Sequence, residues 1–292
     1  MKCLIVNADD FGLTPGVNRA VIEAHTNGIL TSATLMANMP AFNEAVRLAK
    51  ENPTLGVGLH FNITQGLPIA NASTVGSLLN ERGEFLGTST ALLRRWLTGK
   101  LRIQEIEIEL RAQIEKVHQA GLRLTHIDSH KHSHALPPVC EAIINTIGDY
   151  GIKAVRLPRE RWRFPRHNLS AKLITQSLGA FCLSQLCRVS ASKFSNRTAN
   201  AFFGVSQTGF WSKRWLLELI GSLPEGVSEL MSHPGYDDAE LSQIKTRLLK
   251  SRANELALLT DLEVKEAVRR SQVRLINYAQ LERLELKKPI FS

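Results

Sequence analysis

Short apolar runs that are typical of strands alternate with amphipathic stretches that predict helices along most of this 292-residue chain. The clearest helix covers residues 101–120, where apolar side chains recur every three or four positions ahead of a glycine. Strands are predicted at residues 3–6, 29–36, 55–60, 124–128, 153–157, 227–231 and 273–276. Because strands separated by helices pair in parallel, we expect an α/β fold, either a barrel or an open wound sheet.

Acidic and histidine side chains follow two of the predicted strands, at the edge where both architectures gather functional residues. Asp9 and Asp10 come soon after the first strand, and His60 closes the third. Adjacent acids can divide labour, with one binding a cation while the other takes a proton. The alternatives are a turn in which the aspartates bond the backbone ahead of Gly12, and a hydrogen-bonded histidine at the domain edge.

Four of the nine histidines lie within residues 126–134, at alternating spacing at the end of a predicted strand. In extended geometry His126, Asp128 and His130 point to one side, which places a metal ligand next to a partner that can orient it. A solvated histidine-rich loop that binds metal adventitiously is the alternative. The position at a strand end favours a functional site.

Two further residues stand at the ends of predicted strands. His233 follows residues 227–231, which places its imidazole at the same edge as the other candidates unless it is only a turn residue before Pro234. Arg156 lies near the end of residues 153–157. An arginine there can orient a carboxylate through two parallel hydrogen bonds, or it can be an ordinary surface charge.

Asp10, His60 and His130 together supply one carboxylate and two imidazoles from three strand ends. Three protein ligands leave coordination positions open for water and substrate, as a catalytic divalent ion requires. This ligand set suits zinc, iron, manganese, cobalt or nickel, and also magnesium with more water ligands. We therefore expect one divalent metal ion as cofactor, with zinc or magnesium as the first choices.

Three motifs resemble the YdjC-like carbohydrate deacetylases, which are relatives of the NodB-type polysaccharide deacetylases. They are residues 7–13 (Asn-Ala-Asp-Asp-Phe-Gly-Leu), residues 58–60 (Gly-Leu-His) followed by Thr64, and residues 126–132 (His-Ile-Asp-Ser-His-Lys-His). The resemblance covers nearly the whole chain, with the motifs in the same order. It implies a distorted (β/α) barrel and an enzyme that hydrolyses the acetamide of an N-acetylated sugar.

The same resemblance implies a role for each candidate residue. The divalent metal would be held by Asp10, His60 and His130. Asp9 would be the general base, and His233 would protonate the leaving amine. By this resemblance, the first of the two adjacent aspartates is the base and the second is a metal ligand.

Arg156 would steady the base, because residues 156–158 (Arg-Leu-Pro) resemble a motif in which the NodB-type relatives use an arginine for this purpose. Residues 155–160 and 203–204 resemble the branch associated with hopanoid biosynthesis, which implies an N-acetylglucosaminyl hopanoid lipid as substrate. Residues 128–129 (Asp-Ser) resemble instead the branch that acts on chitooligosaccharides. A soluble chitooligosaccharide is therefore an alternative substrate, and another metallohydrolase, such as a phosphoesterase, could share these ligands.

Residues 156–215 carry the entire basic excess, because they hold eleven Lys or Arg and one acidic residue in a chain whose net charge is +9. They also hold nine of the eighteen aromatic residues, among them Trp162, Trp211 and Trp215. This mixture is expected at an anionic membrane surface, which suits a lipid-linked sugar. A solvated basic face over an ordinary aromatic core is the alternative. No nucleic acid is expected as a partner, since no recognition motif accompanies the charge.

We predict a single domain over residues 1–292, with a basic-aromatic insertion at residues 159–213 that contains a helix at residues 169–186. Residues 62–87, rich in Gly, Asn, Ser and Thr, are expected to form a long loop over one face. No apolar run reaches the length of a membrane-spanning helix, and the run at the N-terminus is too short for a signal peptide. The four cysteines show no disulfide framework or CxxC pair, so we expect a cytoplasmic protein that can lie peripherally on the inner face of the membrane.

Overall fold

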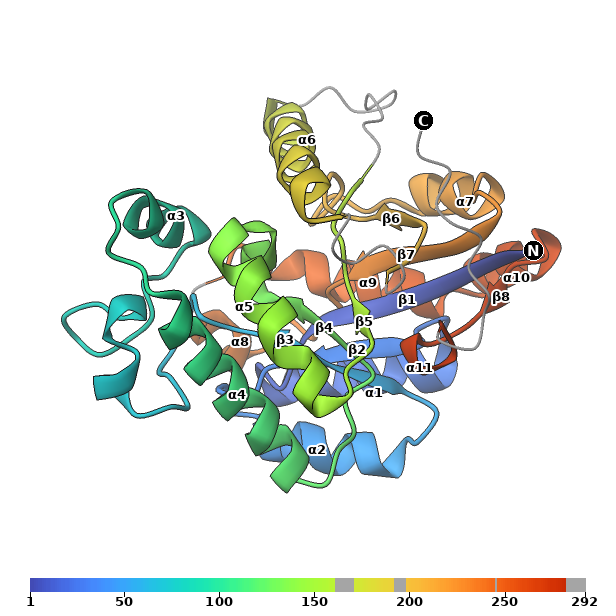
Figure 1. Ribbon diagram of the computed structural model, residues 1–292. Coiled ribbons are helices and arrows are strands. Elements are labelled where there is room, and N and C mark those ends of the chain that lie inside the picture. Colours follow the sequence, from blue (N-terminus) through green and yellow to red (C-terminus); the bar gives the residue numbers. More distant parts are fainter. Residues whose placement is uncertain (161–170, 192–197, 245, 282–292) are drawn as a thin grey trace.

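Eight parallel strands form one curved sheet in the computed structural model, which describes residues 1–160, 171–191, 198–244 and 246–281 (Figure 1). The strands are β1 (Lys2–Phe11), β2 (Ser32–Leu35), β3 (Gly56–Phe61), β4 (His126–Ser129), β5 (Ala154–Val155), β6 (Ala201–Phe203), β7 (Gly226–Ser232) and β8 (Arg274–Leu275). Their order is β5-β4-β3-β2-β1-β7-β6, and β8 pairs with the first part of β1. The predicted parallel pairing is confirmed, and each predicted strand is present with its ends shifted by a few residues.

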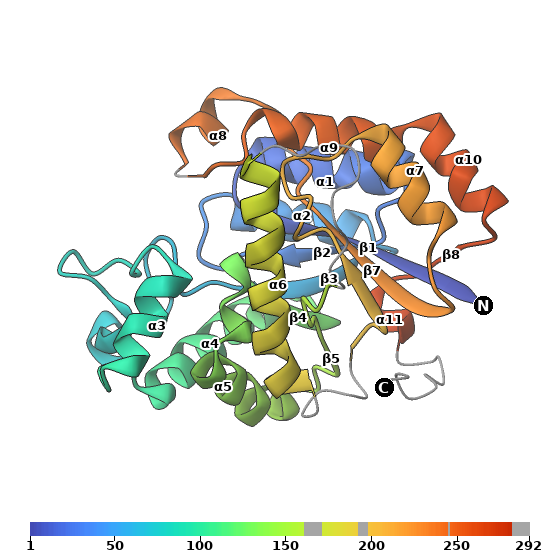
Figure 2. The same cartoon turned by 90° about the horizontal axis from the view of Figure 1, so that it is seen from above.

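Helices surround the sheet and connect its strands (Figures 1 and 2). They are α1 (Pro15–Asn27), α2 (Phe42–Glu51), α3 (Ser89–Leu97), α4 (Ile103–Gln119), α5 (Pro137–Ile147), α6 (Ala171–Ala191), α7 (Lys213–Gly221), α8 (Ala239–Gln243), α9 (Lys250–Thr260), α10 (Leu262–Arg270) and α11 (Tyr278–Leu281). The start of α1 shows how the sequence sets a boundary, since the Thr14 hydroxyl accepts from the amide of Val17 and Pro15 occupies the first turn. Among the described helices, none combines the length and apolar character needed to cross a membrane.

The two edges of the sheet approach each other beyond β5. Glu160 pairs with Phe202 of β6 in an isolated parallel bridge. The Glu160 carboxylate also accepts hydrogen bonds from the backbone amide and the hydroxyl of Ser206, both at 2.8 Å. One bridge therefore stands where a regular barrel would have a full strand pair. The expected distorted (β/α) barrel is confirmed, with its seam between β5 and β6.

The described part of the basic-aromatic segment contributes both a helix and a strand. The helix predicted there is confirmed as α6, whereas β6 is a sheet strand that the sequence pattern did not predict. Trp211 is buried in the main core, and its ring centroid lies 5.2 Å from that of half-buried Trp215, which packs against this core. These two tryptophans therefore pack into the protein, while Trp162 lies outside the described residues.

Residues 62–87 form an extended connection that contains two short turns, η1 (Ala72–Thr74) and η2 (Gly76–Leu78). Buried side chains of α4 fasten this connection to the barrel. The Glu109 carboxylate accepts from the backbone amides of Ile69 and Ala70, both at 2.9 Å. Gln113 bonds both backbone groups of Asn62. The connection is thereby held close to the end of β3.

Candidate metal and catalytic site

The predicted site residues gather at the carboxyl ends of the strands. Asp10 lies near the end of β1 and His60 near the end of β3. His130 begins the short helical segment η3 (His130–Ala135) directly after β4. Arg156 and His233 are the first residues after β5 and β7. Parallel pairing therefore brings side chains from five strands to one end of the barrel.

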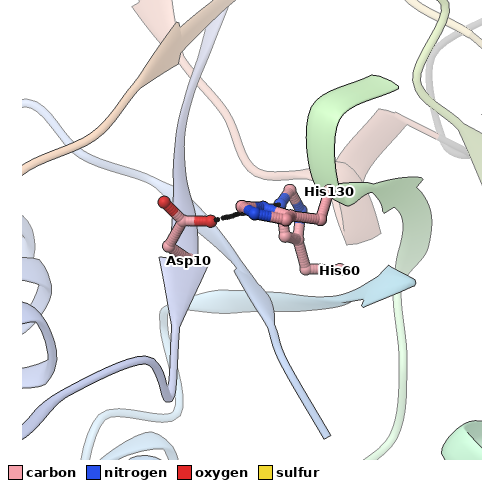
Figure 3. Close-up of side chains that lie close together, drawn as sticks. All are labelled: Asp10, His60 and His130. Carbon is pink, nitrogen blue, oxygen red and sulfur yellow. Dashed lines mark hydrogen bonds and ion pairs between the residues drawn. The ribbon is translucent and has the colours of Figure 1, made fainter. Parts of the chain in front are cut away.

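One oxygen of Asp10 and one nitrogen of each of two histidines form a triangle (Figure 3). Oδ1 of Asp10 lies 3.0 Å from Nδ1 of His130 and 3.4 Å from Nε2 of His60, and the two nitrogens are 3.3 Å apart. Ligand atoms around one ion at about 2.1 Å stand about 3.0–3.4 Å from one another. Asp10 Oδ1 is buried and makes no hydrogen bond with any described residue. The triangle predicted from the strand ends thus has the size and chemistry to hold one metal ion.

Each histidine of the triangle has an acceptor on its other nitrogen. Oδ1 of Asp128 lies 2.6 Å from Nδ1 of His60, and Oε1 of Gln65 lies 3.2 Å from Nε2 of His130. With protons on these two nitrogens, the lone pairs of the other two point into the triangle. The partners of the imidazoles therefore favour the tautomers that a metal ion needs.

Burial and neighbouring charges set the charge of the triangle. Burial would raise the pKa of Asp10, but the charges of Arg252 and His130 hold that pKa well below its ordinary value. Burial likewise disfavours the charged form of His60, yet Asp128 and Asp10 raise its pKa to about 10. The carboxylates of Asp10 and Asp128 thus stabilise a positive charge between them, as the binding of a divalent cation requires.

A fully buried arginine holds the other aspartate of the pair. Arg156 donates from Nη1 and Nη2 to the two carboxylate oxygens of Asp9, both at 2.7 Å. The same guanidinium contacts Asp128 at 2.5 Å and Glu229 at 2.7 Å. Asp9, His60 and Asp128 also have donor atoms close enough to hold an ion, but the guanidinium already supplies the positive charge there. This arrangement favours one ion, in the triangle.

Asp9 also lies near His233. Nε2 of His233 is 3.9 Å from Oδ2 of Asp9, and Nδ1 is 3.9 Å from Oε2 of Glu255. The Glu255 carboxylate accepts from the backbone amide of His233 at 2.6 Å. Burial lowers the pKa of His233 to about 4 and raises that of Glu255 to about 7. His233 is therefore neutral near pH 7, and a proton that it donates must first reach it during a reaction.

Two other histidines of residues 126–134 pack into the interior. His126 stacks on Tyr278 with ring centroids 3.7 Å apart, and Gly58 leaves room for it, since a Cβ there would stand 2.5 Å from the imidazole. His134 lies 2.6 Å from the hydroxyl of Ser129. The histidine-rich run is thus largely a folded part of the barrel.

Sequence reasoning missed three partners of the site. Gln65 belongs to the long connection, and Arg252 and Glu255 belong to α9. Arg252 is buried, with its Nη2 2.5 Å from Oδ2 of Asp10. An arginine and a glutamate three residues apart are usual on a solvated helix, so no signal separated them from surface charges. Asp128 was expected beside a ligand, and it contacts the ring of His60 on the neighbouring strand.

The fold and the site define a class of proteins, the α/β barrels whose strand ends carry one aspartate and two histidines able to hold a metal ion. Within this class the chain belongs to the YdjC-like protein family, whose model matches residues 3–270. The resemblance expected from the three motifs is therefore confirmed.

Relatives match over nearly their whole length. The chain is 34% identical over 285 residues to a carbohydrate deacetylase of Thermoanaerobacter pseudethanolicus, covering 97% of this chain and 100% of the relative. It is 38% identical over 282 residues to a carbohydrate deacetylase of Geobacillus stearothermophilus, covering 96% and 98%. A crystal structure from Enterococcus faecalis V583, for whose protein cellobiose-phosphate cleavage has been suggested, matches with a TM-score of 0.73 and 29% identity over 96% of this chain and 98% of that one.

Proposed function

We propose that this protein is a metal-dependent N-deacetylase that hydrolyses the acetamide of an N-acetylglucosamine unit carried on a lipid, such as an N-acetylglucosaminyl hopanoid. The observation that carries the reaction type is the position of Asp9 and His233 next to the Asp10, His60 and His130 triangle. The relatives named carbohydrate deacetylases support a sugar as the substrate. Zinc or magnesium is the cofactor that we propose for the triangle.

The side chains around the triangle can divide the proton transfers of an amide hydrolysis. A divalent ion supplies Lewis-acid chemistry, polarising the acetamide carbonyl and activating a water. Asp9, oriented and kept ionised by Arg156, takes a proton from the attacking water. His233 then protonates the leaving amine. The imidazole of His233 is neutral near pH 7, so it must acquire that proton during the reaction. The proton that Asp9 takes from the water can pass to His233, 3.9 Å away, and from there to the amine, which returns Asp9 to its ionised form.

An exposed apolar face on α6, a helix that packs against η3, supports a lipid-linked substrate. Ile174, Leu178 and Phe181 recur at helical spacing on α6 and are 37%, 54% and 43% exposed, although the opposite face of this helix is buried. α6 packs against η3, which begins with His130, and stands next to α5 in both views (Figures 1 and 2). With the basic excess of residues 156–215, this face fits a glycolipid in an anionic membrane better than a soluble sugar.

Acetate release by the metal-reconstituted protein tests the proposal. N-acetylglucosaminyl lipid and soluble chitooligosaccharides are offered side by side, with Asp9→Asn as the inactive control. We expect release from the lipid, and a several-fold lower rate on the lipid in Leu178→Gln. The control Leu262→Gln changes another exposed leucine, on α10 at 78% exposure, and should leave the rate unchanged.

Two other outcomes would change the proposed substrate or the proposed reaction. Acetate release from the soluble sugar alone would keep the deacetylase and exclude the lipid substrate. Release of phosphate from a phosphorylated disaccharide, without acetate release from either substrate, would assign the site to a phosphoesterase instead.

A further inference from the structure

A buried arginine far along the chain binds the candidate metal ligand Asp10. Arg252 is 1% exposed, and its Nη2 lies 2.5 Å from Oδ2 of Asp10. Its Nε donates to the backbone carbonyl of Leu248 at 3.0 Å, which fixes the orientation of the guanidinium. Nη1 is buried and has no hydrogen-bond partner in the part of the chain that the structure describes. Among the described side chains, the guanidinium therefore donates to one oxygen of Asp10, Oδ2.

The surroundings accommodate this contact. A Cβ at position 235 would stand 2.9 Å from Cδ and 3.1 Å from Cβ of Arg252, so Gly235 leaves the space that the arginine occupies. Asp10 itself has a φ of 66°, a left-handed conformation that is uncommon outside glycine. Strained backbone persists where surrounding contacts hold it, and here it turns a carboxylate toward two histidines.

We infer that Arg252 is a positioning residue of the metal centre, which restricts Asp10 to binding an ion through a single oxygen. Arg252 holds Oδ2, so Asp10 can offer only Oδ1, and Oδ1 is the atom that faces His60 and His130. A carboxylate that binds through both oxygens would take a further coordination position. Arg252 thus keeps that position for water and substrate. The inference rests on the proposed metal centre and adds to it a residue that the proton transfers do not use.

Cobalt(II) is the probe for the test, because its visible absorption depends on the number of its ligands. The full-length protein is loaded with cobalt as wild type, Arg252→Met, Arg252→Lys and the control Arg214→Met, an exposed arginine paired with Glu218. We expect Arg252→Met to bind cobalt with unchanged stoichiometry but with the weaker bands of a higher coordination number. Its turnover should fall about 10- to 100-fold. Arg252→Lys keeps the positive charge and should lie between the two, and Arg214→Met should match the wild type.

Gly235→Ala perturbs the same contact without removing a charge, because the added methyl group pushes against Arg252. It should shift the cobalt spectrum in the same direction, whereas Gly148→Ala, with nothing within 4 Å of the added Cβ, should not. This pair of variants keeps the inference testable if Arg252→Met does not fold.

Two results would overturn the inference, and they are distinguishable. If the cobalt spectra of Arg252→Met and Gly235→Ala match that of the wild type and only the melting temperature falls, Arg252 is a structural counter-ion and the proposed metal centre stands. If the wild-type protein binds no cobalt, the metal centre and the inference fail together.

Discussion

Arg156 donates two parallel hydrogen bonds to Asp9, each 2.7 Å long, from a fully buried position. The neighbouring Asp10 is held by a different arginine, Arg252, from α9. Two adjacent aspartates therefore have separate cationic partners. Oδ1 of Asp10 faces the two histidines of the triangle, whereas both oxygens of Asp9 are bonded by Arg156. This difference is the physical basis for giving the aspartates different roles.

Asp9→Asn should lower acetate release about 100-fold or more and leave metal binding nearly unchanged, because Asp9 is the proposed base and does not belong to the triangle. Asp10→Asn should instead lose the metal, since the triangle loses its carboxylate. Metal content after dialysis and acetate release are measured on the same samples. A metal-free Asp9→Asn protein would show that the roles of the two aspartates are reversed.

Asp128→Ala should weaken metal binding about 10- to 100-fold, because Nδ1 of His60 loses the acceptor that orients the ring. The dissociation constant is measured by competition with a chelator. Asp149→Ala, which removes an exposed partner of Arg111, is the matched control and should change nothing. An unchanged constant in Asp128→Ala would mean that the Thr34 hydroxyl, 3.1 Å from the same nitrogen, suffices to orient His60.

Arg156→Met should destabilise the protein by about 3–5 kcal/mol, because it leaves buried carboxylates of Asp9, Asp128 and Glu229 without their cation. Urea denaturation of the metal-free protein measures the loss. Arg47→Met removes an exposed pair with Glu51 and should cost at most about 1 kcal/mol. Equal losses in the two variants would contradict the idea that Arg156 compensates the three carboxylates.

The grouping of the three residues of the triangle could be predicted from sequence because they lie at the ends of parallel strands, and parallel strands end at one edge of a sheet. The prediction that Asp10, His60 and His130 meet therefore required only the strand–helix alternation and the position of each residue in it. The distances between them, and the assignment of Asp128 to His60, depend on strand register, which pairs His60 with Asp128 directly.

The rest of the site depends on packing that leaves no local pattern. β6 is a three-residue strand inside a segment that the charge and aromatic pattern predicted to be an insertion, so its short apolar run was not assigned to the sheet. Arg252 and Glu255 lie on α9, whose buried residues include these charged side chains along with apolar ones. Their burial follows from how α9 packs against the end of the barrel. The local sequence does not distinguish a buried charged residue of a helix from an exposed one.

Glu255 and His233 should give the free energy of unfolding two opposite pH dependences. His233 has a pKa of about 4 in the folded protein against an ordinary value of 6.5, so between these pH values the unfolded chain holds a proton that the folded protein lacks. Stability from this group is present above about pH 6.5 and is lost as the pH falls toward 4. Glu255 has a pKa of about 7 against 4.5, so here the folded protein holds the extra proton. Stability from that group is present below about pH 4.5 and is lost as the pH rises through 7.

In the wild type these two contributions oppose each other, so each single variant should reveal the slope of the other group. Glu255→Gln should make stability rise between about pH 4 and 6.5, and His233→Gln should make it fall between about pH 4.5 and 7. Each change amounts to at most about 3 kcal/mol. Urea denaturation of the metal-free proteins at closely spaced pH values gives the curves. Each variant curve is compared with the wild-type curve, because the other charged groups that face the pair are present in all three proteins and cancel in the difference. These groups are Arg252, Asp9, Asp10 and His60. If the three curves are parallel, the two groups do not titrate differently in the folded and unfolded states, and the lowered pKa of His233 and the raised pKa of Glu255 would have to be abandoned.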